Sequence, residues 1–70
     1  MHVLINDKPI HCTSDDTLLS VLNIYCQARN IDVHEVAVAQ DVNLIPRATW
    51  SARTLRDTES FSVFSAVAGG

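Results

Sequence analysis

Apolar residues alternate with other side chains near the start of the chain, with the two-residue period of a β-strand. Met1, Val3 and Ile5 occupy the alternate positions. Residues 6–9 carry turn chemistry that includes a proline, and residues 10–13 then return as a second strand. The pattern therefore predicts a β-hairpin at the N-terminus.

One segment has the period of an amphipathic helix. Its apolar stripe is Leu18, Val21, Leu22 and Tyr25, at spacings of three and four residues. Thr17 is predicted as the N-cap, with Asp16 beside the positive end of the helix dipole. We expect Asn30 to end the helix in a left-handed conformation, in the place that glycine usually takes.

The second half of the chain shows shorter strand signals. Residues 36–39 place valines on one face and alanines on the other, and residues 44–45 pair back after a turn at 40–43. Residues 47–53 are predicted as a short irregular or 3₁₀ segment, in which Trp50 forms a lid over the edge of the core. Leu55 is a further core anchor, residues 57–59 form a turn, and the final strand begins near residue 60.

The predicted order is hairpin, helix, hairpin and final strand. Such an order gives an α+β fold with a mixed sheet of four to five strands packed on one main helix. The last strand lies parallel to the first in the middle of the sheet, after a right-handed crossover. This is the β-grasp layout, and residues 1–70 form a single domain.

Composition excludes several classes of function. Five scattered basic residues and a net charge of −3 argue against a nucleic-acid surface. No apolar stretch reaches the length of a membrane span, so we expect a cytoplasmic protein. Cys12 and Cys26 are interpreted as reduced, apolar fillers. His2 and His11 can meet across the hairpin, but neither they nor His34 have the spacing of metal ligands, so no metal site is predicted.

The two glycines of the chain stand together at its end, as Gly69 and Gly70. Their lack of Cβ atoms suits a channel too narrow for other side chains, and a terminal carboxylate is ionised at neutral pH. A strand-like run over 61–67 leads directly into this end. We expect a flexible tail over about 67–70 whose terminal carboxylate is the functional group. The alternative is a frayed end with no role.

With these elements in hand, the chain resembles the ThiS family of sulfur carrier proteins. The most specific match is Ile45-Pro46-Arg47 followed by Trp50, which is similar to the family's apolar-Pro-Arg-x-x-Trp segment. Further matches are Ile5-Asn6-Asp7, Thr17-Leu18-Leu19, Asp57, Phe64 and the tail from Val67 to Gly70. Two departures concern loops: Thr58 stands where the family commonly has glycine, and residues 27–35 look longer than usual.

The resemblance implies a ubiquitin-like fold and a protein-borne substrate that is not an enzyme. A ThiF-type enzyme would use ATP to adenylate the Gly70 carboxylate, with Ala68, Gly69 and Gly70 threaded into that partner. Sulfur from a persulfide donor would leave a thiocarboxylate for a ThiG-type thiazole synthase in thiamine biosynthesis. The chain itself would bind no cofactor. The alternatives are a carrier like the small subunit of molybdopterin synthase, a ubiquitin-like protein modifier, and an interaction module with an inert tail.

Strand alternation also predicts a docking face for the partner. If the alternate valines face the helix, the opposite face of the sheet carries an apolar set: Leu4, Ala37, Ala39, Phe64 and Ala66. Arg47 is expected to help place an acidic residue of the partner.

Overall fold

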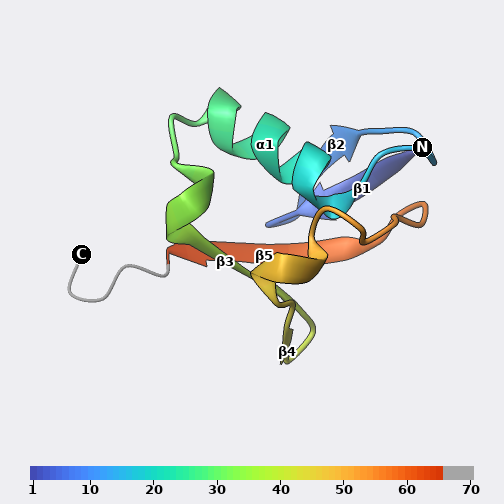
Figure 1. Ribbon diagram of the computed structural model, residues 1–70. Helices are drawn as coiled ribbons and strands as arrows, with labels where there is room; N and C mark the ends of the chain where they lie inside the picture. Colours follow the sequence, from blue (N-terminus) through green and yellow to red (C-terminus); the bar gives the residue numbers. More distant parts are fainter. Residues whose placement is uncertain (66–70) are drawn as a thin grey trace.

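The structure is a computed structural model that describes residues 1–65. Its strands are β1 (His2–Ile5), β2 (Lys8–His11), β3 (Val36–Gln40), β4 (Asn43–Leu44) and β5 (Ser60–Ser65). Its one α-helix within that range is α1 (Leu18–Ala28), and two 3₁₀ turns span Val33–Glu35 and Arg47–Thr49. Figure 1 shows how these elements follow one another along the chain.

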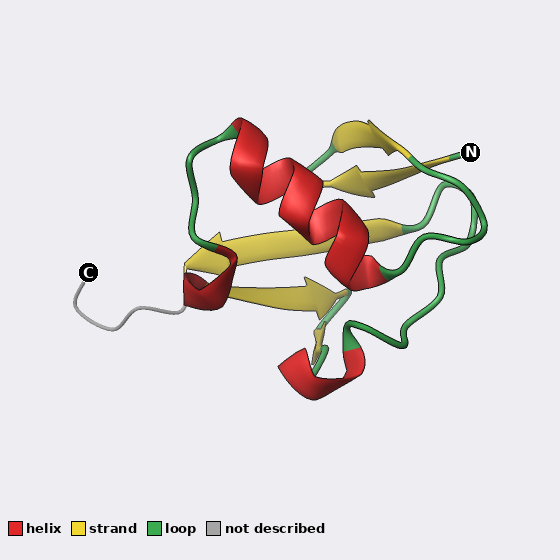
Figure 2. Ribbon diagram, turned by 45° about the horizontal axis from the view of Figure 1, so that its top comes forward, coloured by secondary structure: helices red, strands yellow, loops and turns green. Residues whose placement is uncertain are grey.

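The strands form one mixed sheet in the order β2-β1-β5-β3-β4. The central strand β5 runs parallel to β1 and antiparallel to β3. Helix α1 crosses one face of this sheet, as Figure 2 shows. The predicted α+β fold, a mixed sheet of four to five strands with the last strand parallel to the first, is therefore confirmed, and the sheet has five strands.

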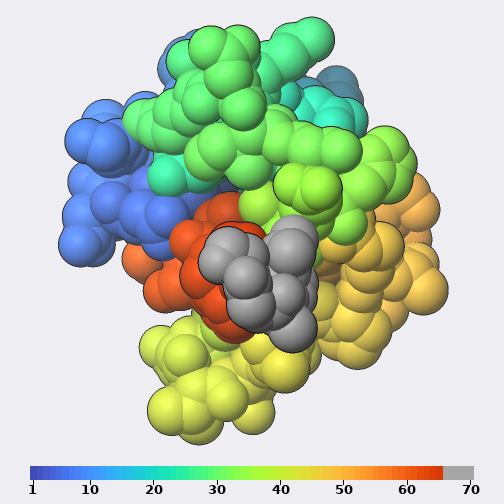
Figure 3. Space-filling view, turned by 90° about the vertical axis from the view of Figure 1, so that its left-hand side faces the viewer, coloured from blue at the N-terminus to red at the C-terminus, as the bar shows by residue number. Residues whose placement is uncertain are grey.

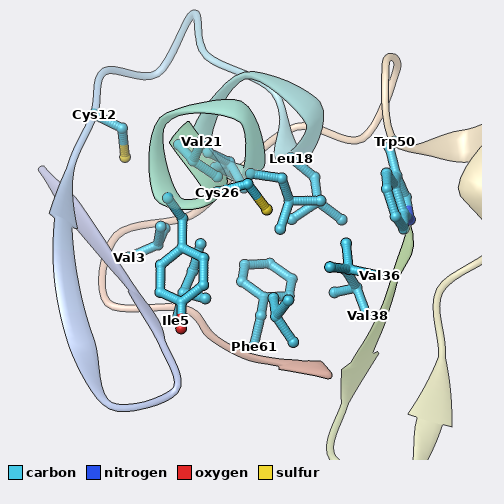
Figure 4. Packing of buried hydrophobic residues seen from close by; sticks show 14 residues of the cluster. Val3, Ile5, Cys12, Leu18, Val21, Cys26, Val36, Val38, Trp50 and Phe61 are labelled. Carbon is cyan, nitrogen blue, oxygen red and sulfur yellow. The ribbon is translucent and has the colours of Figure 1, made fainter. Parts of the chain in front are cut away.

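The core lies between α1 and the sheet (Figure 4). Its strand residues occupy the alternate positions that the pattern predicts: Val3, Ile5, Val36, Val38, Phe61 and Val63. All four residues of the predicted helical stripe are buried against them, and Leu55 is buried as well. The two-residue alternation of the strands and the three-to-four-residue spacing of the helix therefore place their apolar side chains in one layer, between α1 and the sheet.

Both ends of α1 are closed by side chains or backbone geometry that the sequence indicates. The Thr17 hydroxyl accepts from the Ser20 amide, and the Ser20 hydroxyl accepts from the Thr17 amide in return. At the other end, Asn30 has a φ of 56°. The Ile31 amide then donates to the Cys26 carbonyl at 2.9 Å, which is the bond of a Schellman motif.

The first turn is shorter than predicted. Asn6 and Asp7, with φ values of 51° and 67°, make the whole turn, and β2 begins directly at Lys8. Pro9 therefore lies within β2, opposite Leu4. In an antiparallel pair of strands, hydrogen-bonded and non-hydrogen-bonded residue pairs alternate, and Leu4–Pro9 is a non-hydrogen-bonded pair. The backbone nitrogen of Pro9 therefore faces away from β1, and since β2 is an edge strand, no sheet hydrogen bond is lost there.

Trp50 is more deeply buried than the predicted lid. Its side chain is 2% exposed and belongs to the core cluster. The 3₁₀ turn at Arg47–Thr49 carries the indole inward, where its Nε1 donates to the Ile45 carbonyl at 3.0 Å. The buried N–H thereby keeps a partner, as burial of an indole requires.

The start of β5 is tied to β3 by a charged network. The Glu59 carboxylate accepts from the guanidinium of Arg53 at 2.5 Å and from the amide of Gln40 at 2.8 Å. Burial alone raises the pKa of Glu59, but these hydrogen bonds and one from the Arg56 backbone outweigh it. The net result is a lowered pKa, so the carboxylate stays ionised beside Arg53.

The turn before β5 holds a β-branched residue in an unfavourable conformation. Thr58 has a φ of 65°, a region that suits glycine and that β-branched residues rarely enter. Replacing Thr58 with Gly is therefore expected to stabilise the fold by about 1 kcal/mol and to raise Tm by about 4–8 °C. Thermal unfolding followed by circular dichroism measures this shift.

The matched control is Ala52→Gly, which places glycine in a nearby exposed turn that has no positive φ. That variant should lose stability, since glycine there only adds freedom to the unfolded chain. A Tm for Thr58→Gly equal to or below that of the unmodified chain would show that the turn carries no strain.

Candidate functional site

Strand β5 carries the chain toward its C-terminal residues from the centre of the sheet. It is paired with β3 as far as Ser65, the last described residue, which is five residues before Gly70. Figure 3 looks onto the end of the molecule where β5 stops. The predicted site residues Ala66, Ala68, Gly69 and Gly70 lie outside the described residues, so their roles stay predictions.

Phe64 lies on the face of the sheet opposite α1, as predicted. It is 47% exposed and is the direct cross-strand partner of Ala37 on β3. Ala39 lies two residues further along the same face of β3. These side chains form one apolar surface beside the end of β5.

The structure adds Leu44 to that surface, a residue that the strand alternation alone does not assign to it. Leu44 pairs with Ala39, so its side chain shares the face of Ala39, and it is 67% exposed. We define the apolar face as Ala37, Ala39, Leu44 and Phe64. The register of the β3–β4 hairpin is the signal that places Leu44 there, and a two-residue loop at 41–42 sets that register.

Leu4 does not lie next to Phe64 of the apolar face. Its partner on β5 is Ser60, four positions before Phe64, which corresponds to about 13 Å along the strand. The intervening Ser62 lies on the same face as both. The structure therefore separates two residues that the predicted docking face had grouped, and the docking role of Leu4 stays a prediction.

Arg47 is engaged within the molecule. Its guanidinium donates to the carbonyls of Val33, His34 and Val36, at 3.0, 3.2 and 2.6 Å. It also stacks on the ring of Trp50 at 4.4 Å from the centroid. These contacts explain the Pro-Arg-x-x-Trp spacing, because a 3₁₀ turn brings the arginine over the indole. A docking role for Arg47 stays a prediction.

Asn6 ties β1, α1 and β5 together at the same end of the molecule. Its side-chain oxygen accepts from the Val63 amide at 2.9 Å, and its Nδ2 donates to the Val63 carbonyl at 3.0 Å. The same Nδ2 donates to the Tyr25 hydroxyl at 3.0 Å. The sequence gives no local signal for these bonds, because Asn6 and Val63 are 57 positions apart.

A shallow, mainly apolar hollow of about 230 Å³ opens beside these residues. It is lined by Asn6, Tyr25, Ile31, Glu35, Val36, Val63, Phe64 and Ser65. The hollow lies between the C-terminal end of α1 and the last turn of chain before β3, next to the point where β5 ends.

The histidines and cysteines of residues 1–65 do not form a metal centre. No group of three or more His, Cys, Asp or Glu in this range could hold a metal ion. His2 and His11 are cross-strand partners, so the predicted meeting is confirmed, but no third ligand joins them. Cys12 and Cys26 are buried, and burial raises the pKa of both thiols, which disfavours the reactive thiolate.

The helix α1 is too short to cross a membrane, and no other helix among the described residues is long and apolar enough to do so.

Comparisons with known proteins show a similar sequence and a similar structure. No protein-family model matches the chain. The sulfur carrier protein ThiS of Escherichia coli (strain K12) is 25% identical over 72 residues, covering 100% of both chains. The crystal structure of a thiamine biosynthesis protein (ThiS) from Geobacter metallireducens matches with a TM-score of 0.71 at 19% identity, again over 100% of both chains. Over its full length the chain is therefore similar to the sulfur carrier protein ThiS, and its fold is the ubiquitin-like β-grasp.

Proposed function

We propose that this chain is a sulfur carrier in thiamine biosynthesis and that the Gly70 carboxylate is the group that carries the sulfur. The observation that carries the proposal is the similarity to the sulfur carrier ThiS over the full length of both chains. The Gly-Gly end of the sequence and a β5 that leads toward it from the sheet centre support the same assignment.

The proposed chemistry begins at the terminal carboxylate. A carboxylate oxygen of Gly70 attacks the α-phosphorus of ATP on a ThiF-type adenylating enzyme, and pyrophosphate leaves. The terminal sulfur of a persulfide donor then attacks the acyl carbon of the adenylate, and AMP leaves. A second thiol then attacks the donor's sulfur in the resulting acyl disulfide, so that a disulfide forms between the donor and this thiol. The S–S bond to the acyl sulfur breaks, and that sulfur takes the electron pair and stays on Gly70 as a thiocarboxylate.

The chain supplies the reacting group and its presentation, whereas the partners supply the catalysis. ATP is consumed by the activating enzyme, and the chain holds no cofactor of its own in this scheme. A thiazole synthase of the ThiG type then accepts the sulfur. Ala68, Gly69 and Gly70 offer little bulk, which suits passage through a narrow channel in each partner.

Pyrophosphate exchange into ATP tests the first step. With a ThiF-type enzyme, labelled pyrophosphate should enter ATP only when the chain is added, because the exchange requires a reversible acyl adenylate on Gly70. Exchange that is equally fast without the chain, or absent with it, would contradict the proposal. Stable conjugates of higher mass in cell lysate would instead favour the protein modifier.

The apolar face is proposed as the docking surface for the activating enzyme. Replacing Phe64 with Asp would place an unpaired charge in that interface, and we expect the KM for the carrier to rise about tenfold or more. The thermal unfolding curve should change little, since Phe64 is 47% exposed. Exchange kinetics at several carrier concentrations give the KM.

The matched control is Val42→Asp, which adds the same charge at the tip of the β3–β4 hairpin, where Val42 is 95% exposed. That variant should keep the KM of the unmodified chain. If both variants raise KM equally, added charge and not the apolar face explains the effect. If Phe64→Asp unfolds the protein, Phe64 belongs to the core.

A further inference from the structure

We propose that Asn6 is a positioning residue: its side-chain amide acts as an additional residue of β1 that holds β5 where the chain leaves for its reacting end. The inference rests on the proposed function for the reaction that it serves. Its structural basis is a pair of backbone-like hydrogen bonds between this amide and Val63.

Strand β1 stops short of the end of β5. Asn6 and Asp7 turn the chain away at positive φ, so the β1–β5 pairing covers Leu4 with Ser60 and Ile5 with Phe61. The Asn6 backbone amide adds one bond to the Phe61 carbonyl at 3.0 Å. Beyond that point, β1 has no backbone to offer Val63.

The Asn6 side chain takes over the pairing there. Its Oδ1 accepts from the Val63 N–H and its Nδ2 donates to the Val63 carbonyl, so both main-chain groups of Val63 are bonded on this side. The two bonds fix which end of the amide is oxygen, since only this orientation satisfies both Val63 groups. The other hydrogen of Nδ2 goes to the Tyr25 hydroxyl, which anchors the amide to α1.

Positioning matters because activation by a partner requires the terminal carboxylate to reach an ATP phosphorus. Val63 is seven residues before Gly70, and β5 is the last element of the described fold. Near Val63, β5 is held by the Asn6 side chain on one edge and by β3 on the other. The segment that follows therefore has a fixed starting point and direction. Loss of that hold lowers the fraction of bound carriers in reactive geometry, which reduces kcat and leaves docking unchanged.

Asn6→Gly tests the inference because glycine accepts the positive φ of this position and deletes only the amide. We expect faster hydrogen exchange at the Val63 amide by NMR, and a kcat for carrier adenylation lowered about tenfold at unchanged KM. Asp7→Gly makes the same change in the same turn and keeps the amide. This control should retain the kcat of the unmodified chain.

The outcomes separate two failures. If the unmodified chain is not adenylated, the proposed function fails and the inference falls with it. If it is adenylated and Asn6→Gly, folded at the assay temperature, keeps its kcat, the positioning role of Asn6 is wrong and the proposed function stands. A loss of kcat shared equally by Asp7→Gly would assign the effect to the turn and would also overturn the role of the amide.

Discussion

Deleting Gly70 is expected to abolish activation of the carrier while leaving its fold intact. The variant still ends in a carboxylate, but on Gly69, so the reacting group is withdrawn by about 3.3–3.6 Å. Reacting atoms must approach within about 3–3.5 Å, so a shift of this size removes the reactive geometry. We expect pyrophosphate exchange to fall by at least about a hundredfold.

Adding one tryptophan after Gly70 gives a complementary test. That variant keeps both glycines but converts the Gly70 carboxylate into an amide and places a large side chain at the end. Activation should be lost again, while circular dichroism melting should match that of the unmodified chain. If either variant supports exchange at the normal rate without trimming of the added residue, the Gly70 carboxylate is not the reacting group.

Replacing Trp50 with Ala is expected to remove a large part of the stability of the fold. The indole is 2% exposed, and truncation of a buried tryptophan costs about 3–5 kcal/mol. A protein of this size has about 4–10 kcal/mol in total. The variant also removes the donor to the Ile45 carbonyl and the ring beneath Arg47. Tm should therefore fall by about 15 °C or more, or the chain should be unfolded at 37 °C.

Phe64→Ala is the control for Trp50→Ala, because it truncates an aromatic side chain that is 47% exposed. Its cost should stay within about 1 kcal/mol, since much of the ring is already in water. Equal losses in the two variants would contradict the assignment of Trp50 to the core and of Phe64 to the surface. Chemical denaturation gives both free energies of unfolding.

Local patterns are sufficient to predict the order of the elements and most of the core, but not the start of β2 at Lys8 or the burial of Trp50. Each strand that packs on α1 shows two-residue alternation, and the helix shows its stripe, because burial of one face selects apolar residues at the period of the element. The helix ends are also predictable. Thr17 and Asn30 act through their own backbone neighbourhood, so a short stretch of sequence carries the whole signal.

The arrangement of the site depends on contacts that no local pattern carries. The separation of Leu4 from Phe64 follows from the β1–β5 register, which joins residues 56 positions apart. The position of Leu44 is an exception, because the short loop at 41–42 sets the β3–β4 register locally. The residue type of Arg47 suggests docking, whereas its three carbonyl partners come from residues 11 to 14 positions away. The bonds of Asn6 to Val63 join the two ends of the chain, so only the folded topology reveals them.

Intact-mass spectrometry tests the central assignment most directly. The chain is incubated with a ThiF-type enzyme, ATP, a persulfide donor and a thiol, and is then weighed and fragmented. We predict a gain equal to the mass difference between sulfur and oxygen, located on Gly70. An unchanged mass, in a mixture where a known carrier of this kind gains sulfur, or a gain located on Cys12 or Cys26, would contradict it.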